Sequence, residues 1–522
     1  MSALKTFYRH SSHYLGGRVA VMMLGFISFP LFTRVFSVAE YGEMSLIMNT
    51  VLLLTVMSKF GFQHAVQRYY PEYASSPDPT ALSRYYATLF YGTGFIALTL
   101  CALFLIAVPF GATQFLGITA NGALMLALIL VVVRSLRSMQ MNLMQMENKT
   151  RLFNGVDILA KALIIATICF FLFFWKKSIF SFFLGTVIVE TAFLLQYMPF
   201  LSRRGLLSIQ VFNPEFFRSA VMFAFPLMTA EISWVVLDSG DRFFVQHYLG
   251  AQSLGFYAAA YGIATYLQDV MMAPLQLALF PICMKLWTNK GKAETQEFLS
   301  RSLDHFAMVA VGVVSVFMVA SRDVIVLLAS KKFQEAHRLI PYLVIGLVLS
   351  AVTVYFRPGL LIHKKASKIA TATLGASILN VALNIALLPR IGLLGAAIAT
   401  TVSYGAIVVF LAWESLRVLP FKIEWIAFVR YVVAGSAVAY AATYLPVQKP
   451  LLNAICKGTF VVTLYAAVLW VTDVRVRKLI SRAYQIGSRQ IRQLGKQPPV
   501  TPMAPLAAPA PAPVEEEIAV NQ

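Results

Sequence analysis

Residues 162–175 read ALIIATICFFLFFW, an almost unbroken apolar run in which hydrophobic side chains do not alternate with polar ones. A strand of a membrane β-barrel is about ten residues long and alternates in polarity. A helix that crosses a bilayer instead needs about 20 mostly apolar residues. Extended to residues 155–175, the run meets the helical requirement, so it predicts an α-helical membrane protein and not a β-barrel.

The rest of the chain has the same character. Of its 522 residues, 59% are hydrophobic and 13% are charged, whereas about 25% of the residues in a soluble domain are charged. Apolar windows recur from residue 14 to residue 471, which excludes a soluble enzyme held by one membrane anchor. About fourteen of these windows are long enough to span a bilayer. They cover residues 14–33, 43–63, 85–108, 119–138, 155–175, 179–199, 219–239, 255–280, 303–320, 339–357, 369–388, 393–413, 424–444 and 451–471.

Basic residues predict the orientation of these helices. Lys and Arg accumulate in the cytoplasmic loops of membrane proteins, and most of the 43 Lys and Arg residues fall on one side if both termini are cytoplasmic.

The net charge of +20 does not indicate nucleic acid, because its largest block, in residues 475–496, directly follows the last span. Apolar residues recur there near helical spacing. We expect a basic amphipathic helix that binds anionic lipids, and then a disordered Pro- and Ala-rich tail at residues 497–522.

The two halves of the chain show a weak internal repeat. Residues 155–163 align with residues 375–383, and residues 34–42 align with residues 247–255. A repeat of six helices returns the chain to the same side of the membrane, so two such repeats enclose a cleft about an axis along the membrane normal. Chance similarity between apolar helices is the alternative explanation. The predicted fold is all-α, with six-helix lobes at residues 1–208 and 209–418 around a central cavity and two further helices at 419–474.

Three stretches of the sequence resemble a known family of transporters. The first is FSVAEYG at residues 36–42, and the second is DRFFVQHYLG at 241–250, followed by LGFYAAA at 254–260. The third combines Asn380 and Asn384 with GAAIAT at 395–400. In this order and spacing they are similar to the Wzx-like polysaccharide exporters of the multidrug/oligosaccharidyl-lipid/polysaccharide (MOP) superfamily, over roughly residues 10–475.

This resemblance implies a function and a location. Such a protein is a flippase of the bacterial inner membrane that moves undecaprenyl-diphosphate-linked oligosaccharide repeat units from the cytoplasmic to the periplasmic leaflet by alternating access. The expected partners are that lipid-linked glycan and, in the same pathway, polysaccharide polymerase and export proteins. No nucleic-acid partner is expected.

Basic residues in or near the spans are candidates for binding the substrate. A lipid-linked diphosphate is polyanionic, and the planar fork of Arg can hold phosphate oxygens in pairs. Ionisable residues inside a membrane are costly and usually face a cavity or a partner. The alternative is that these side chains extend to the membrane surface. The candidates are Arg18, Lys59 and Arg357 within the cavity and Arg34, Arg68 and Arg242 at its rim.

Acidic residues in the spans are candidates for coupling transport to an ion. Glu231 and Asp238 are seven residues apart and so lie on one side of the predicted seventh helix, and Asp269 lies near the middle of the eighth. A proton or sodium ion bound there could bias the inward and outward states. A hydrogen bond to a neighbouring helix is the alternative.

Three further residues could hold a hard cation. Asn380 and Asn384 share one helix face, and Thr400 lies on the next predicted helix. The resemblance extends here to the lipid II flippase branch, in which a sodium site between helices 7, 11 and 12 has this spacing. Asn384 stands where an acid would strengthen such a site, and hydrogen bonding between helices is the alternative. The four cysteines and seven histidines show no metal-binding spacing, and no other cofactor is expected.

One charged pair is predicted to be structural. Asp157 and Lys161 are four residues apart on a predicted helix. An acid that precedes a base at this spacing forms a favourable pair. We expect this pair to lower the cost of inserting both charges into the membrane.

Other functions are also compatible with a polytopic membrane protein. A drug/cation antiporter of the same superfamily is the nearest alternative. A membrane polysaccharide polymerase or glycosyltransferase would handle related substrates, but it would need acid/base or metal-binding motifs, and the sequence contains neither HExxH nor Asp-x-Asp. We therefore expect no enzymatic activity.

Overall fold

The computed structural model describes residues 22–110, 122–147, 149–445 and 449–473, together with Arg475 and Arg477. All regular structure in these residues is helical. The chain forms two compact units, Met1–Leu464 and Tyr465–Gln522, which divide within helix α16. Arg18, most of the basic segment and the C-terminal tail lie outside the described residues.

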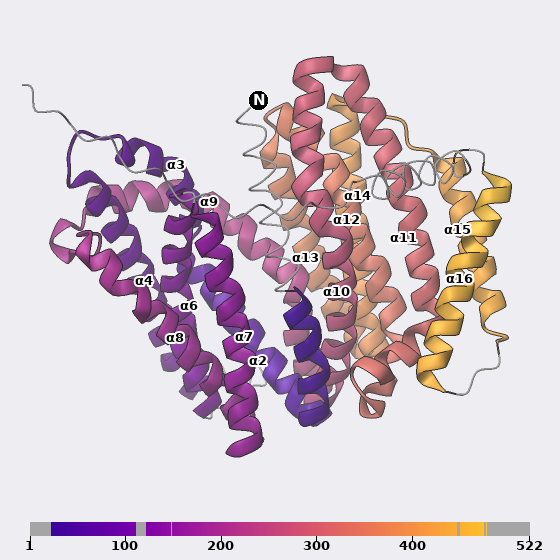
Figure 1. The fold of residues 1–522 in the computed structure, drawn as a ribbon, viewed down its shortest axis with the longest axis horizontal. Coiled ribbons are helices and arrows are strands. Elements are labelled where there is room, and N and C mark those ends of the chain that lie inside the picture. The colour runs from indigo at the N-terminus through magenta and orange to yellow at the C-terminus, as the bar shows by residue number, and fades with distance from the viewer. Residues whose placement is uncertain are drawn as a thin grey trace, which may run out of the picture. The chain divides into compact units, whose positions relative to one another are not determined.

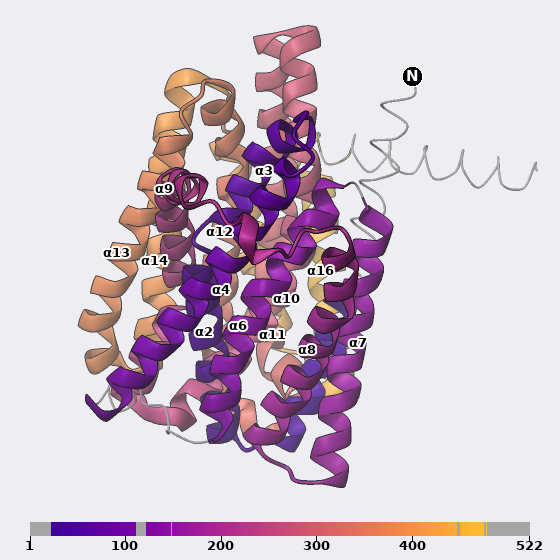
Figure 2. The ribbon, with the colours of Figure 1, turned by 90° about the vertical axis from the view of Figure 1, so that its left-hand side faces the viewer.

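The first group of helices, which we call the first lobe, stands together in Figure 2. In it, α8 packs between α6 and α7, and α6 also packs on α2 and α4. The start of α2 is stabilised by a capping box formed by Ser37 and Glu40. Its long helices are α2 (Val38–Lys59), α4 (Ala81–Ala107), α6 (Gly122–Met146), α7 (Thr150–Phe174) and α8 (Ile179–Arg203).

The second lobe follows in the chain (Figure 1). Here α12 packs against α10 and α14, and α13 packs against α14. Its helices are α9 (Pro214–Ser239), α10 (Asp241–Lys290), α11 (Lys292–Leu328), α12 (Ile340–Ile362), α13 (Ala366–Ile391) and α14 (Leu393–Val418).

Two further helices follow the second lobe. The first, α15 (Trp425–Ala442), packs on α11, where the Tyr431 hydroxyl donates to Asp304 at 3.1 Å. The second, α16 (Pro450–Thr472), is tied to the same helix, because the Asn453 amide donates to Asp323 at 2.8 Å.

The helices match the predicted membrane spans. Among the residues that the structure describes, twelve segments are long and apolar enough to cross a membrane. One of them, Pro214–Lys290, contains both α9 and α10, and a shorter apolar helix covers Met22–Val35. Counting these separately gives the fourteen predicted helices, so the chain is a multi-pass membrane protein and the predicted all-α fold is confirmed.

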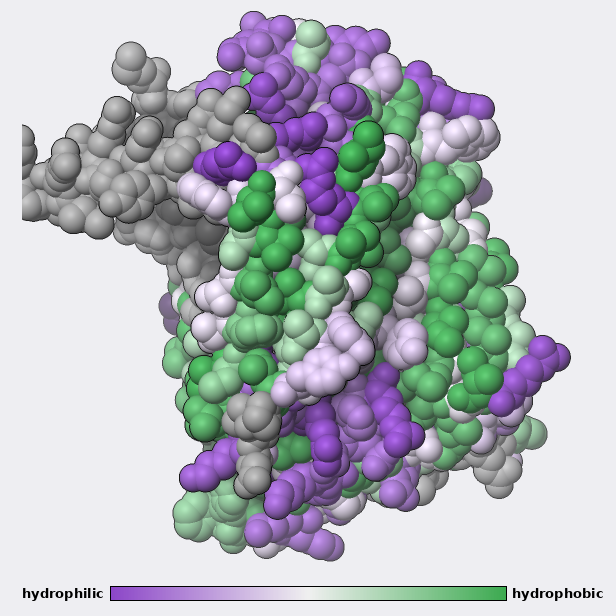
Figure 3. Space-filling view, turned by 90° about the vertical axis from the view of Figure 1, so that its right-hand side faces the viewer, coloured by the Kyte–Doolittle hydropathy of each residue, from purple (hydrophilic) through white to green (hydrophobic). Residues whose placement is uncertain are grey.

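The outer surface has the polarity that a bilayer requires. Figure 3 shows apolar side chains gathered across the middle of one face, with hydrophilic side chains above and below them. On α15, Ile426 and Val433 are 78% and 62% exposed. Such exposure of large apolar side chains would be unfavourable in water but is expected against lipid tails.

Helix α10 is longer than its predicted span of residues 255–280. It runs over Asp241–Lys290 and is broken at Gly250, whose φ of 76° and ψ of 177° are not helical. Glycine tolerates this conformation because it has no Cβ. Helix α11 likewise begins before its predicted span, in the polar residues from Lys292 onward.

The two lobes meet where α2 packs on α10. The contact is so close that a Cβ on Gly255 would lie 1.9 Å from the Val38 carbonyl oxygen, and one on Gly42 would lie 2.2 Å from that of Ala251. Both glycines belong to the motifs at residues 36–42 and 254–260. These motifs therefore contain the small residues that let two helix backbones touch.

We expect Gly255→Ala to destabilise the protein. The new methyl group would collide with backbone rather than with a flexible side chain, and such overpacking typically costs about 1–3 kcal/mol or more. Thermal unfolding of the purified protein should give a melting temperature several degrees lower. Gly375→Ala is the matched control, because no atom lies within 4 Å of its added Cβ. Equal melting temperatures for the two variants would contradict the close contact.

Candidate functional site

Helix α9 connects the two lobes. At its start, the Asn213 side chain caps the helix by accepting from Phe216 N at 3.0 Å, and the Asn213 backbone donates to Thr88 on α4 at 2.9 Å. Along its length α9 contacts α2, α3 (Phe62–Ala74) and α4 of the first lobe and α10, α13 and α14 of the second. In Figure 1 it runs from beside α3 toward α13. A side chain on α9 can therefore interact with residues of either lobe.

Glu231 on α9 makes a polar contact across the lobes. Its carboxylate accepts a hydrogen bond from the Gln63 amide, and His64 Nε2 lies 2.8 Å from the same oxygen. Lys59, at the end of α2, lies within electrostatic range of this carboxylate. We call these four residues, Lys59, Gln63, His64 and Glu231, the interlobe bridge.

The turn between α2 and α3 places this bridge. Phe60 and Gly61 both have positive φ, at 48° and 68°, so the helix is interrupted after Lys59 and α3 starts in a new direction. A Cβ on Gly61 would lie 2.9 Å from the Ala224 carbonyl oxygen of α9. The turn therefore brings the start of α3 close enough to α9 for the Gln63 and His64 side chains to reach Glu231.

Arg357 on α12 is a cation that forms no ion pair with any residue in the described part of the chain. Its guanidinium lies 5.7 Å from the ring centroid of Trp234 on α9, and its only hydrogen bond to a described residue goes to Thr353 Oγ1 at 3.4 Å. Its Nε is buried without a partner, and no described carboxylate lies within 4.0 Å of it. Trp234 lies three residues after Glu231, so the two are neighbours on the surface of α9. Arg357 therefore contacts α9 about one helical turn from Glu231.

A second cluster of charges lies inside the second lobe. Asp241 is fully buried, and its Oδ2 accepts hydrogen bonds from the Tyr257 hydroxyl and, at 3.2 Å, from the Thr400 hydroxyl. Arg242 Nη1 lies 3.8 Å from the other carboxylate oxygen. Tyr257 of the LGFYAAA motif therefore forms a hydrogen bond with Asp241 of the DRFFVQHYLG motif.

Asp238 extends this cluster to helix α14. Its Oδ1 accepts hydrogen bonds of 3.2 Å from the hydroxyls of both Tyr261 and Tyr404. Arg242 lies 4.3 Å from the ring centroid of Tyr261. Arg242 Nη1 also donates to the backbone oxygen of Asp238 at 3.2 Å, so one guanidinium group lies beside both aspartates. We call the set, Asp238, Asp241, Arg242, Tyr257, Tyr261, Thr400 and Tyr404, the carboxylate network.

The predicted cation ligands are only partly brought together. Thr400 binds Asp241, whereas the Asn384 amide donates to Asn380 through its backbone oxygen at 2.8 Å and its Oδ1 at 3.0 Å. This leaves Asn384 Oδ1 and Asp241 Oδ1 buried without a hydrogen-bond partner. Buried oxygens of this kind suit a hard cation. In the part of the chain that is described, no group of three or more His, Cys, Asp or Glu side chains could hold a metal.

The predicted rim arginines have other contacts. Arg34 donates to the Leu327 carbonyl oxygen at 2.8 Å, at the end of α11. Arg68 pairs with Glu72 on α3 and remains more than half exposed. Arg242, by contrast, is buried in the carboxylate network. A sequence alone does not reveal these partners, because the Leu327 carbonyl oxygen is distant in the chain and Glu72 lies outside the apolar spans.

The remaining predicted residues lie apart from these clusters. Asp269 is on an exposed part of α10. Asp157 and Lys161 do not form an ion pair within 4.0 Å in the described structure, although both lie on α7 as expected. Lys161 instead lies within electrostatic range of Glu190 on α8.

Sequence analysis missed Gln63, His64 and Trp234. The first two lie in α3, a polar helix that a search for apolar windows passes over. Trp234 lies on the same side of α9 as Glu231 and Asp238. Its spacing of three and four residues from these acids is the sequence pattern that could have predicted its place near the site.

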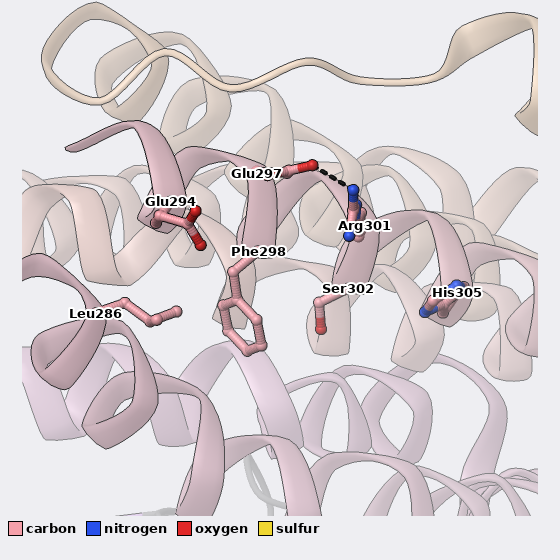
Figure 4. Close-up of a pocket in the computed structure, with 7 residues that line it drawn as sticks. All are labelled: Leu286, Glu294, Glu297, Phe298, Arg301, Ser302 and His305. Carbon is pink, nitrogen blue, oxygen red and sulfur yellow. Dashed lines mark hydrogen bonds and ion pairs between the residues drawn. The ribbon is translucent and has the colours of Figure 1, made fainter. Parts of the chain in front are cut away.

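A separate pocket of about 360 Å³ lies where α10 ends and α11 begins. Figure 4 shows the residues that line it. Leu286 and Phe298 supply apolar surface, and Arg301 forms an ion pair with Glu297 beside them. The remaining lining residues are Glu294, Ser302 and His305. All of them belong to α10 or α11, so this pocket lies within one lobe, and its arginine is already neutralised.

The chain is similar in sequence to one protein family. The family model described as polysaccharide biosynthesis protein matches residues 8–287. No curated protein sequence is significantly similar to the chain.

Several solved structures share the fold. The lipid II flippase MurJ in an inward closed conformation has a TM-score of 0.70 at 15% identity, covering 91% of this chain and 100% of MurJ. An inward-facing multidrug resistance MATE transporter of the MOP superfamily has a TM-score of 0.62 at 13% identity, covering 77% of this chain and 97% of the transporter. A MOP superfamily transporter from Pyrococcus furiosus has a TM-score of 0.51 at 14% identity, over 79% and 95% of the two chains.

Proposed function

Because the chain belongs to the polysaccharide biosynthesis protein family, we propose that it is a Wzx-like flippase. It moves undecaprenyl-diphosphate-linked oligosaccharide repeat units from the cytoplasmic to the periplasmic leaflet of a bacterial inner membrane, for surface polysaccharide or exopolysaccharide synthesis. The observation that carries this proposal is Arg357, a guanidinium without a carboxylate partner beside the contact between the lobes. A diphosphate offers the paired oxygens that a guanidinium fork binds.

Helix α9 supports the alternating access that such transport requires. Glu231, Trp234 and Asp238 follow each other at spacings of three and four residues, so they lie along one side of the helix. The interlobe bridge, the arginine contact and the carboxylate network are therefore linked through one rigid element. A movement of α9 that separates Glu231 from Gln63 and His64 would also move the Arg357 contact and the carboxylate network.

We propose that a proton or a sodium ion drives this movement through the carboxylate network. Arg242 lies 3.8 Å from the Asp241 carboxylate and donates to the Asp238 backbone oxygen. The carboxylate network thus holds one cation and two carboxylates, so it carries an excess negative charge when both are ionised. A proton on either carboxylate, or a sodium ion bound by Asp241 Oδ1 and Asn384 Oδ1, which accept no hydrogen bond, would neutralise it. In reconstituted vesicles, a pH gradient and a sodium gradient applied separately distinguish the two ions.

The pathway around the flippase follows from the same proposal. Both termini would be cytoplasmic, as the distribution of Lys and Arg predicts. The basic segment at residues 475–496 would bind anionic lipids, and polysaccharide polymerase and export proteins would act on the product.

A drug/cation antiporter is the second candidate, because a MATE transporter shares the fold. The charges discriminate between the two candidates. A cationic drug that contacts Trp234 would be repelled by Arg357, which has no described carboxylate within 4.0 Å.

Complementation of a flippase-null bacterial strain tests the proposal. We expect the chain to restore surface polysaccharide and to clear the accumulated undecaprenyl-linked repeat units. The same strain is scored for resistance to cationic drugs. Drug resistance without any change in lipid-linked intermediates would replace the flippase with the antiporter.

A further inference from the structure

The first lobe contains a buried carboxylate held by two arginines. Arg134 Nε donates to Glu190 Oε1 at 3.0 Å, and Arg137 Nη1 donates to Glu190 Oε2 at 3.2 Å. Both arginines lie on α6 and the glutamate lies on α8. The Glu190 side chain is 7% exposed, Arg137 is 11% exposed and Arg134 is 25% exposed.

These charges do not balance. Two guanidinium groups share one carboxylate, and Arg137 Nη2 is buried without a hydrogen-bond partner. Lys161 on α7 adds a third positive charge within electrostatic range of Glu190. No other described carboxylate lies within 4.0 Å of these three cations. The cluster therefore has an excess positive charge and a free donor.

The depth of the cluster makes this excess costly. Arg134 is the middle residue of α6, and Glu190 and Lys161 each lie one residue from the middle of their helices. In a membrane-spanning helix these positions correspond to the centre of the bilayer, where an unpaired charge costs several kcal/mol and usually marks a binding site or pathway. Transporters also bind their substrates near this depth.

We propose that Arg134, Arg137 and Lys161 form a phosphate-binding site in the first lobe, separate from Arg357. Glu190 holds the two guanidinium groups in place when no phosphate is bound. A phosphate group enters on the side of Arg134, which is the more exposed of the two arginines. It accepts hydrogen bonds from the terminal nitrogens of Arg134 and from Arg137 Nη2. The phosphate comes from a polyprenyl diphosphate or from a lipid headgroup, and the first of these sources rests on the proposed flippase function.

A binding assay without transport tests this site. The full-length protein is placed in phosphatidylcholine nanodiscs, and binding of radiolabelled farnesyl diphosphate is measured at equilibrium. We expect the double variant Arg134→Gln/Arg137→Gln to bind at least about tenfold more weakly, because each lost charged contact to phosphate is typically worth more than 1 kcal/mol. Arg301→Gln is the matched control, since Arg301 is exposed and already paired with Glu297.

Competition identifies the source of the phosphate. Displacement of the probe by phosphatidylglycerol, and not by inorganic pyrophosphate, assigns the site to a lipid headgroup. Displacement by pyrophosphate, with farnesol inactive, assigns it to a diphosphate. Either result can be obtained even if the complementation test of the flippase fails. Equal probe affinities for the parent and the double variant would overturn the site.

Glu190→Gln gives a second test with the opposite sign. Removing the competing carboxylate frees both guanidinium groups, so we expect tighter binding of the probe, by about threefold or more. Because two buried arginines are then left without an acid, pyrophosphate should raise the melting temperature of this variant more than that of the parent. Lys161→Gln, on an exposed position, should weaken binding severalfold without changing the melting temperature. If the cluster were purely structural, Glu190→Gln would neither tighten binding of the probe nor make the protein more responsive to stabilisation by pyrophosphate.

Discussion

Arg357→Gln is expected to reduce transport of the lipid-linked glycan at least about tenfold. Glutamine keeps hydrogen-bonding ability but loses the charge and the fork that hold two phosphate oxygens. Arg357→Lys should retain part of the activity, because lysine keeps the positive charge but lacks the planar, forked donor group of arginine. The measurement is the amount of undecaprenyl-linked repeat unit accumulated in the complemented null strain, normalised to the amount of protein in the membrane.

The thermal stability of the same variants separates a binding role from a structural one. Arg357 Nε is buried without a partner, so removing the guanidinium should leave the melting temperature unchanged or raise it. Arg390→Gln is the control, because Arg390 is an exposed residue in the last turn of α13. Loss of transport together with a large fall in melting temperature would mean that Arg357 stabilises the packing of α9 on α12, and the binding role would be abandoned.

The sequence predicts the helices well because one physical requirement decides them. A segment that crosses the bilayer must be apolar over its whole length and must satisfy its own backbone hydrogen bonds. Hydropathy therefore indicates α12 and α14 within a few residues. It does not indicate where α10 ends and α11 begins, because the polar residues around Lys290 and Lys292 form helix outside any apolar window.

The candidate site was less predictable because it depends on contacts between distant residues. Sequence analysis selected Glu231 and Arg357 as ionisable residues within spans, but the partner of Glu231 is Gln63, which is 168 residues away. Arg242 shows the same difficulty. Its charge indicated a cavity rim, whereas the adjacent Asp241 holds it in a buried network. Charge and approximate depth can be read from a sequence, but the distant contacts that bury a charge, such as those of Tyr257 and Thr400 with Asp241, cannot.

Fixing the interlobe bridge should stop transport almost completely. If the lobes must separate at Glu231 during each cycle, a covalent link there holds the protein in one state. Gln63→Cys and Glu231→Cys are introduced after the native Cys101, Cys169, Cys283 and Cys456 are replaced by Ser. The two positions are linked with a short bis-methanethiosulfonate reagent, because both native side chains are long and a direct disulfide requires Cα atoms within about 7 Å.

The outcome depends on where the link is placed. Transport in reconstituted vesicles should fall to the background level after the reagent is added and should return when dithiothreitol cleaves the link. Lys368→Cys with Glu414→Cys is the control pair, because these residues contact each other at 3.0 Å within the second lobe, between α13 and α14. A link there should leave transport intact, since helices of one lobe move together. Full transport by protein linked at positions 63 and 231 would show that this contact does not open, and α9 would then be a fixed support between lobes that move elsewhere.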